Sequence, residues 1–160
     1  MLLTIDVGNT NITMGVFLDN VLLGMFRMMT KQPRTSDEYG FTICGILEHR
    51  GIDPAKIDAV IAASVVPDIM HSLNSAIIKY LHTTPLIVSP ELGTGIRVTT
   101  ENPSRTGADR IVNAVAGYAV AEGPVIVIDF GTATTYDLVG PERTLEACII
   151  APGIETAGRS

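Results

Sequence analysis

The first thirty residues alternate between apolar and polar positions in three short runs. The runs cover Leu2 to Val7, Ile12 to Leu18 and Val21 to Met28, and aliphatic and β-branched residues are frequent in them. Gly-Asn-Thr-Asn separates the first run from the second, and Asp19-Asn20 is a tight-turn sequence before the third. This pattern predicts a three-stranded meander.

A helical period follows the meander. Thr35 and Glu38 have the spacing of a capping box, and Gly51 is placed to end a helix, so we predict a helix from about Ser36 to Arg50. Apolar residues at helical spacing predict a second helix at about 68–82. Short apolar runs predict strands at 59–65 and 86–89.

Residues 90–106 are rich in Pro, Gly and Thr and predict a long loop. A loop of this length within a compact domain is more often functional than structural filler. A third helix, rich in Ala and Val, is expected at about 108–121 and is expected to be buried on most sides. An apolar strand at 125–129 and a second strand that ends at Val139 follow it.

The chain then repeats its opening pattern. The segment Ile5 to Thr10, IDVGNT, matches Ile128 to Ala133, IDFGTA, with Ile, Asp and Gly in register. Both copies open a hairpin, which adds weight to a short match. We therefore expect an α/β fold in which a complete βββαβαβ unit, residues 1–123, precedes the start of a second, duplicated unit, residues 124–160. The chain is then expected to be a piece of a two-lobed protein.

Composition restricts the function further. The chain has 160 residues, of which 46% are hydrophobic, and this is enough for a hydrophobic core. A net charge of −6 with scattered basic residues argues against nucleic acid as the main partner. No apolar stretch reaches the roughly 20 residues of a membrane helix, and the first residues lack the basic start of a signal peptide. A P-loop kinase is excluded because the chain has no G-x-x-x-x-G-K-[ST] sequence.

Cysteine, histidine and methionine suggest no chemistry of their own. Cys44 and Cys148 have no metal or redox spacing and are expected to be reduced core thiols of a cytoplasmic protein. The histidines have no ligand spacing and are expected at the surface, and the methionines are expected as core filler. The residues in question are His49, His71 and His82, and Met25, Met28 and Met29.

Two acidic strand ends are candidate phosphate sites. After Asp6, Gly8 allows a sharp turn and leaves room for an approaching phosphate, which the surrounding N–H groups could bind. Asp6 itself would act through Mg²⁺, because like charges repel and this hard cation prefers oxygen ligands. Asp129 ends the equivalent strand, and Thr132 offers a hydroxyl to a phosphate oxygen. The alternative interpretation of each segment is a plain hairpin turn with solvated side chains.

A third candidate, Gly107-Ala108-Asp109-Arg110, begins the helix after the long loop. A helix N-terminus favours anions, and Arg105 and Arg110 could bind a carboxylate with two hydrogen bonds. Asp109 fits a catalytic base, since in phosphoryl transfer the proton can leave late. The alternative is that Asp109 only caps the helix and Arg110 pairs on the surface.

Together the three motifs resemble the type III pantothenate kinase family. They are DVGNTN at 6–11, GADR at 107–110 and DFGTATTYD at 129–137, they occur in family order, and the similarity spans essentially the whole chain. The resemblance implies an actin-like (ribonuclease-H-like) fold and transfer of the ATP γ-phosphate to pantothenate, the first step of coenzyme A synthesis. It also implies a cytoplasmic homodimer that uses Mg²⁺ and a monovalent cation, K⁺ or NH₄⁺.

The resemblance assigns roles residue by residue. Asp109 would be the proton acceptor, and Asp129 would bind the monovalent cation. The substrate contacts would be Gly107, Ala108, Asp109 and Arg110. The ATP contacts would be Asp6, Val7, Gly8, Asn9, Thr10, Asn11, Ile12, Thr13 and Thr132.

This chain departs from the family pattern at one position that can be inspected. Many members have a Tyr before the Glu-Asn-Pro run, where this chain has Thr100, which puts the shape of the substrate pocket in question. The 160 residues are also expected to lack much of the adenosine pocket. Two alternatives stay open, a kinase for another small molecule and a non-catalytic, nucleotide-binding regulator. The GADR segment argues against the first, and the acidic residues of the three motifs argue against the second.

Overall fold

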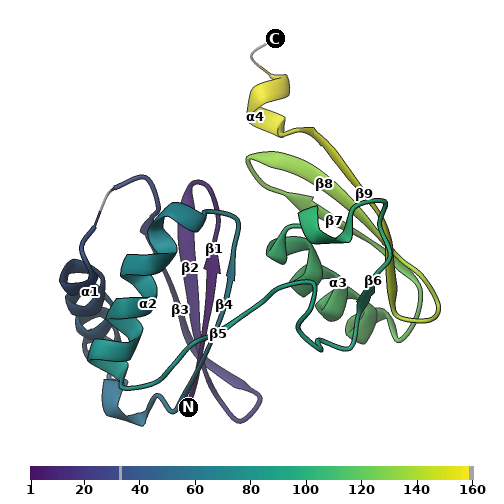
Figure 1. The fold of residues 1–160 in the computed structure, drawn as a ribbon. Helices are drawn as coiled ribbons and strands as arrows, with labels where there is room; N and C mark the ends of the chain where they lie inside the picture. The colour runs from purple at the N-terminus through teal and green to yellow at the C-terminus, as the bar shows by residue number, and fades with distance from the viewer. Residues whose placement is uncertain (33, 159–160) are drawn as a thin grey trace. The chain divides into compact units, whose positions relative to one another are not determined.

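The structure is a computed structural model in which residues 1–32 and 34–158 are described (Figure 1). It divides into two compact units, unit 1 at Met1–Ile87 and unit 2 at Val88–Ser160. The lobe boundary expected near residue 123 rests on the sequence repeat and not on contacts, so it stays a prediction. Within the described residues, no helix has both the length and the apolar character needed to span a membrane.

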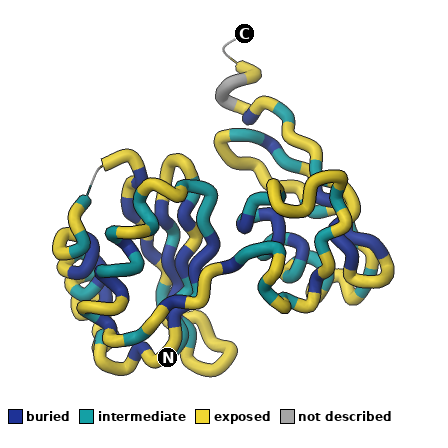
Figure 2. The backbone as a smooth tube through the Cα atoms, in the orientation of Figure 1, coloured by how far each residue is buried: buried dark blue, intermediate teal, exposed yellow. Residues whose placement is uncertain are grey.

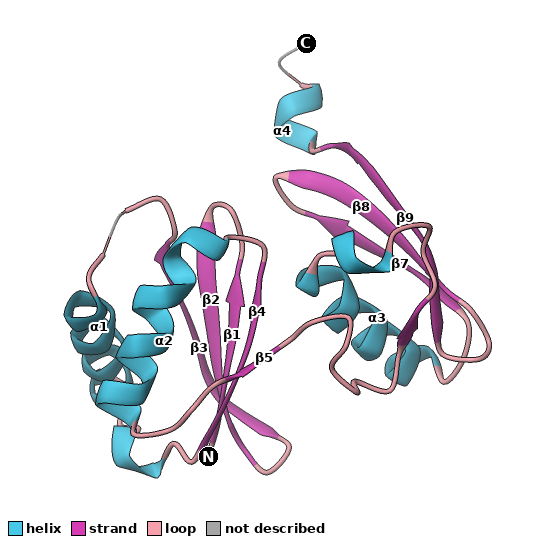
Figure 3. Ribbon diagram, in the orientation of Figure 1, coloured by secondary structure: helices cyan, strands magenta, loops and turns pink. Residues whose placement is uncertain are grey.

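A five-stranded mixed sheet forms the framework of unit 1. Its strands are β1 (Leu2–Val7), β2 (Asn11–Leu18), β3 (Val21–Met29), β4 (Ala59–Ser64) and β5 (Leu86–Ile87). The sheet has the order β3-β2-β1-β4-β5 (Figure 3). The first three strands are antiparallel, as expected for a meander, whereas β4 is parallel to β1 and β5 is parallel to β4.

Two helices, α1 (Ser36–His49) and α2 (Pro67–Leu81), cover one face of this sheet (Figure 1). A short 3₁₀ turn, η1 (Pro54–Lys56), follows α1. The predicted capping box is confirmed, because the Glu38 N–H donates to Thr35 Oγ1 at 3.3 Å and the Thr35 N–H donates to Glu38 Oε2 at 2.7 Å. Gly51 follows the helix with φ +73°, the left-handed conformation that ends many helices.

The core of unit 1 lies between these helices and the sheet (Figure 2). Leu3, Ile5 and Val7 on β1 are at most 3% exposed, and Leu73 and Ile77 on α2 are fully buried against the same cluster. Side chains of a strand alternate between its two faces, so the apolar positions of β1 point to the helices. Asp6 lies between two of these buried positions and is exposed.

Unit 2 is a four-stranded sheet with one long helix. In chain order its elements are β6 (Arg97–Val98), the 3₁₀ turn η2 (Pro103–Arg105), α3 (Ala108–Ala121), β7 (Val125–Phe130), β8 (Ala133–Val139), β9 (Thr144–Pro152) and α4 (Ile154–Ala157). The strand order is β6-β9-β8-β7. The long loop expected at 90–106 therefore contains a short strand, β6, which pairs in parallel with β9. Strand β9 was not predicted from the sequence pattern.

Helix α3 packs on one face of the unit 2 sheet. Gly117 allows this contact, since a Cβ there would overlap the side chain of Val127 on β7. Ala114, Val139 and Leu145 are fully buried in the same cluster. The other face of the sheet carries apolar side chains that the described residues leave exposed.

The meander of unit 2 repeats that of unit 1 in its strand register. Asp6 on β1 pairs with Thr13, and Asp129 on β7 pairs with Thr135. The pairing of β2 with β3 shifts between Val16 and Phe17, and the pairing of β8 with β9 shifts at the equivalent step, after Leu138. A β-bulge is a specific structural feature, so its recurrence at the same place confirms the duplication that the sequence match predicts.

The two meanders differ in whether helices cover the apolar face of the sheet. On β7, Ile126, Ile128 and Phe130 are 61%, 47% and 68% exposed. Their equivalents on β1 are buried beneath α1 and α2. We call this surface of unit 2 the open face, which consists of Ile126, Ile128, Phe130, Tyr136, Leu138 and Ile149. It is on the side of the sheet opposite α3.

One expectation about the methionines is wrong. Met28 is buried, but Met25 is 53% and Met29 is 54% exposed. They lie on β3, the edge strand of its sheet, and alternation turns them to the face opposite the two helices. Cys44 and Cys148 are free thiols of intermediate burial. The histidines at 49, 71 and 82 are exposed, as expected.

Candidate functional site

The turn between β1 and β2 is fixed by hydrogen bonds from within unit 1. The Gly8 N–H donates to the Asn11 carbonyl oxygen at 3.0 Å. Thr30, which is 5% exposed, donates its N–H to the Thr10 carbonyl oxygen at 3.0 Å and its hydroxyl to the Gly8 carbonyl oxygen at 2.7 Å. These bonds fix the backbone of the turn to the residue that follows β3. No sequence signal pointed to Thr30, because it lies beyond the end of β3 and outside every motif.

This turn presents polar side chains to solvent. Asn9, Thr10 and Asn11 are exposed, as is Asp6 at the carboxyl end of β1. The Gly8 N–H is engaged within the turn, so an anion would depend on the neighbouring groups. Two of the residues predicted to contact ATP, Val7 and Ile12, have fully buried side chains and could reach a ligand only through their backbone. Thr13 is of intermediate exposure.

The second turn, between β7 and β8, has a similar form. The Gly131 N–H donates to the Ala133 carbonyl oxygen at 3.1 Å, and Thr132 at the tip is exposed. Gly153 lies directly against this turn, and a Cβ on it would overlap the carbonyl oxygens of Thr132 and Gly131. Only glycine fits at this position without a shift of the turn. Gly153 directly follows β9, as Thr30 follows β3 in unit 1.

Helix α3 carries the predicted base, Asp109, and, one turn later, a residue that contacts the predicted cation ligand, Asp129. Gly107 is the N-cap and provides no side-chain cap, while Asp109 Oδ1 accepts from the Arg110 N–H at 2.9 Å. One helical turn further, Asn113 Nδ2 donates to Asp129 Oδ2 at 3.3 Å. Residues four apart lie on one face of a helix. Asp109 and Asn113 therefore share one face of α3, on which Asn113 contacts Asp129, and Asp109 also accepts an N–H of the first turn.

Arg110 forms an ion pair in the interior of unit 2, not on the surface. Its Nη1 donates to Asp137 Oδ1 at 2.7 Å, and the two side chains are 9% and 0% exposed. Burial acts against the charge of Arg110, but the hydrogen bond and the charge of Asp137 outweigh it, so the pKa of Arg110 is raised. The alternative in which Arg110 pairs on the surface is wrong, because α3 lies on the sheet and directs Arg110 toward β8.

Cys148 belongs to the same cluster. It is the pairing partner of Asp137 across β8 and β9. Burial raises the pKa of the Cys148 thiol to about 11, and the neighbouring Asp137 carboxylate adds to this effect. Asp137 Oδ2 is buried and forms no hydrogen bond of regular geometry with a described residue. Asp137 is the last residue of the motif DFGTATTYD at 129–137, but this position alone predicted no binding or catalytic role for it.

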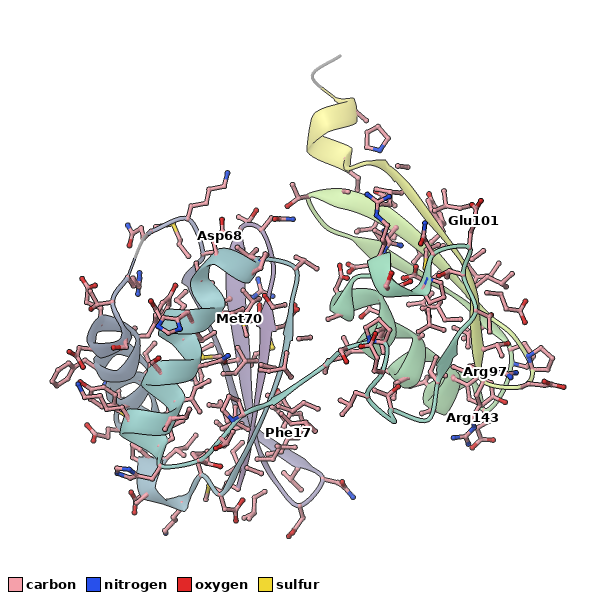
Figure 4. All side chains as sticks on the ribbon, viewed as in Figure 1. Phe17, Asp68, Met70, Arg97, Glu101 and Arg143 are labelled. Carbon is pink, nitrogen blue, oxygen red and sulfur yellow. The ribbon has the colours of Figure 1, made fainter. Side chains whose placement is uncertain are left out.

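A pocket of about 400 Å³ opens beside this ion pair in unit 2. Glu101, on the loop between β6 and η2, lies at its wall and is labelled in Figure 4. The Thr100 and Thr106 hydroxyl groups, 3.0 Å apart, form a hydrogen bond in the same wall. Further lining residues are Asn102, Arg105, Arg110 and Cys148. The long loop and the start of α3 thus form a cavity with two arginines.

The donors available to a metal are oxygen atoms. Asp129 is exposed and offers a carboxylate, of which one oxygen accepts from Asn113. Among the described residues, no group of three or more His, Cys, Asp or Glu side chains could enclose a metal ion. One carboxylate beside a turn fits a hard cation held partly by other ligands such as phosphate or water.

Residues 2–160 match the family model of the type III pantothenate kinases. The chain belongs to this family. A type III pantothenate kinase of Agathobacter rectalis is 51% identical over 160 residues, which are all of this chain and 62% of the relative. A type III pantothenate kinase of Halalkalibacterium halodurans is 45% identical over 154 residues, 96% of this chain and 61% of the relative.

The chain therefore spans less than two thirds of the length of these type III pantothenate kinases. A solved structure of a candidate 2-dehydro-3-deoxygalactonokinase from Sinorhizobium meliloti is 12% identical, with a TM-score of 0.57 over 94% of this chain and 53% of that one. An identity this low shows the fold alone. The two proteins share a fold, which agrees with the actin-like fold that the family resemblance implies.

Proposed function

We propose that the protein containing this chain is a pantothenate kinase, which transfers the γ-phosphate of ATP to pantothenate and forms 4′-phosphopantothenate. The observation that supports it most is the grouping of Asp109, Asn113 and Asp129 within unit 2 of a chain that belongs to the type III family. This grouping brings a candidate base and a candidate cation ligand to one side of α3. The reaction would be the first step of coenzyme A synthesis.

Asp109 is the proposed proton acceptor. It would take the proton of the pantothenate hydroxyl as that oxygen attacks the γ-phosphorus and ADP departs. Phosphoryl transfer has a loose transition state, so this proton can move late and a carboxylate suffices as the base. A positioned base of this kind contributes about 10²–10⁴-fold in rate.

The other site residues would bind the substrates. The segment from Asp6 to Thr13 and the tip residue Thr132 are proposed to contact the ATP phosphates, with Mg²⁺ to neutralise their charge. Asp129 is proposed to bind a monovalent cation, K⁺ or NH₄⁺. Gly107 to Arg110 are proposed to bind pantothenate, whose carboxylate suits a guanidinium. Thr100 has a smaller side chain than the Tyr that many family members have at this position, so it would fill less of the wall of the pantothenate pocket.

The homodimer and the cytoplasmic location are also proposals, and the family resemblance supports both. ATP and pantothenate as substrates fit a cytoplasmic enzyme. Light scattering on the longest natural reading frame that contains these residues would test the dimer. A monomer at micromolar concentration would contradict it.

The activity is tested with that same reading frame. It is incubated with Mg-ATP, KCl and pantothenate, and phosphopantothenate is measured by mass spectrometry. Asp109→Asn is expected to lower the rate by about 10²-fold or more, because it removes the base. Asp68→Asn is the matched control, since Asp68 is also the second residue of its helix and is exposed. It is expected to keep the parent activity.

The outcomes separate the alternatives. No product from a folded protein that binds a fluorescent ATP analogue would contradict the kinase proposal and favour a non-catalytic regulator. Phosphorylation of a sugar or an acyl acid in a substrate panel, in place of pantothenate, would favour another small-molecule kinase. Equal rates for the parent and Asp109→Asn would reject Asp109 as the base.

A further inference from the structure

The buried ion pair between Arg110 and Asp137 is hard to explain by stability alone. Moving two charges out of water is costly, and apolar residues of similar size often replace such a pair without loss. Asp137 is fully buried and Arg110 is 7% exposed. A feature with this cost suggests a purpose other than packing.

The internal repeat shows that the strands do not need this acid. Gly15 on β2 occupies the position equivalent to Asp137, because Gly15 pairs with Thr4 and Met25 where Asp137 pairs with Val127 and Cys148. The meander of unit 1 has the same register and the same bulge without a buried carboxylate. The acid in unit 2 therefore serves something that unit 1 lacks, which is the arginine of α3.

Arg110 connects the buried pair to the pocket. Its side chain lines the cavity of about 400 Å³, while the ion pair with Asp137 engages Nη1. A guanidinium has five N–H donors in a fixed plane, so one anchored corner leaves other donors for a ligand. The bond to Asp137 also restricts the Arg110 side chain to fewer rotamers. Less conformational entropy is then lost when a ligand binds to the guanidinium.

The remaining charged side chains of the pocket are one arginine and two glutamates. Arg105 also lines it and forms no ion pair with another described residue. Glu101 and Glu146 lie at the wall as well, and Glu146 Oε1 accepts from the Thr144 hydroxyl at 2.8 Å. Since Asp137 offsets the charge of Arg110, the pocket side chains carry a small net negative charge and no excess of positive charge. Such a site selects a ligand by the geometry of its carboxylate and not by a strong general field.

We propose that Asp137 is a positioning residue, which holds the guanidinium of Arg110 at the pocket wall for the carboxylate of the substrate. Cys148 pairs with Asp137 across β8 and β9 and lines the same pocket. This inference rests on the proposed function, because it takes pantothenate as the carboxylate ligand. Asp137 would act through Arg110 and would not itself touch the substrate.

The test is steady-state kinetics of Asp137→Asn in the full reading frame. Asparagine keeps the shape and an acceptor oxygen but removes the charge that fixes the guanidinium. We expect KM for pantothenate to rise about tenfold or more, with KM for ATP within about twofold of the parent, since one charge-assisted contact is weakened. Glu142→Gln is the control, because Glu142 pairs with Arg97 at the exposed surface, at 3.6 Å. It is expected to change neither KM.

A double replacement covers the case in which Asp137→Asn fails to fold. Arg110→Met with Asp137→Leu exchanges the pair for apolar residues and is expected to fold. Its KM for pantothenate should equal that of Arg110→Met alone, because Asp137 has no role once the guanidinium is gone. A further tenfold loss in the double variant would overturn the inference.

The failure of this inference can be told apart from the failure of the proposed function. The parent protein is assayed first, and its lack of product would reject the proposed function. Product from the parent with an unchanged KM for pantothenate in Asp137→Asn would reject only the positioning role. Equal increases of KM for both substrates would reject it as well, since that pattern indicates a general loss of structure.

Discussion

The Thr30 hydroxyl donates a hydrogen bond of 2.7 Å to the Gly8 carbonyl oxygen, and the Thr30 N–H binds the Thr10 carbonyl oxygen of the same turn. A single buried residue beyond the end of β3 thus fixes the loop that is proposed to contact ATP. The hydroxyl bond is neutral and partly buried, and such a bond contributes about 1 kcal/mol to stability. Loss of this hydrogen bond should change the geometry of the turn more than the stability of the fold.

Thr30→Val tests this directly, because it replaces the hydroxyl by a methyl group of similar size. We expect KM for ATP to rise about three- to tenfold and KM for pantothenate to stay unchanged, with a loss of about 1 kcal/mol in unfolding free energy. Urea denaturation and initial rates measure the two effects. Thr30→Ser restores the hydroxyl and should recover the parent KM. Equal values for the valine and serine variants would contradict the role of the hydroxyl.

Gly153 offers a second prediction about a turn. Gly153→Ala should displace Gly131 and Thr132, because the new Cβ would overlap their carbonyl oxygens. Overpacking of this kind costs about 1–3 kcal/mol, and we expect weaker ATP binding together with a lower melting temperature. Gly123→Ala is the control, since a Cβ there meets nothing within 4 Å. A melting temperature of Gly153→Ala equal to that of this control would reject the tight contact.

The Cys148 thiol predicts a pH dependence. Its pKa is raised from 9.0 to about 11, first by burial and then by the Asp137 carboxylate. In the unfolded chain the thiol ionises near its ordinary value, so between about pH 9 and 11 the folded state holds more protons and stability falls as pH rises. Alkylation by iodoacetamide, followed at the Cys148 peptide by mass spectrometry, should accelerate toward pH 11 in the native protein. In 8 M urea the same increase should occur near the ordinary value.

Removal of the Asp137 charge should shift this profile. The carboxylate is one of the causes that raise the pKa of Cys148, so Asp137→Asn should move the alkylation profile to lower pH. Cys44, whose pKa is raised by burial and by Glu48, is in unit 1 and serves as the internal control. An unchanged Cys148 profile in the variant would mean that burial alone sets it.

Local patterns in the sequence predicted the fold well. Alternation gave β1 to β3, the Thr35–Glu38 spacing gave the start of α1, and the short Ile-Asp-Gly match gave the duplication that the shared bulge confirms. Contacts between distant residues were not accessible in the same way. The Arg110–Asp137 pair spans 27 residues, and it depends on the packing of α3 on β8, which no periodicity encodes. The exposure of Met25 likewise follows from the order of the strands.

The open face of unit 2 gives the last prediction. Its residues Ile126, Ile128 and Phe130 are exposed, whereas Leu3 and Ile5 at equivalent places are buried under two helices. An apolar sheet face of this kind binds other apolar groups. The 160-residue chain alone should therefore bind the dye ANS strongly, and Ile128→Thr with Phe130→Thr should reduce the fluorescence at least about twofold by removing apolar area.

The same measurement in the longest natural reading frame asks whether other residues cover this face. By analogy with unit 1, a pair of helices would do so, and dye binding per molecule should then fall below that of the 160-residue chain. Replacement of the exposed Val120 by Thr on α3 is the control, since it removes an 86% exposed apolar side chain outside the open face. Equal dye binding by the parent and the double variant of the short chain would show that the dye binds elsewhere. Equal dye binding would contradict the prediction that the open face binds apolar groups.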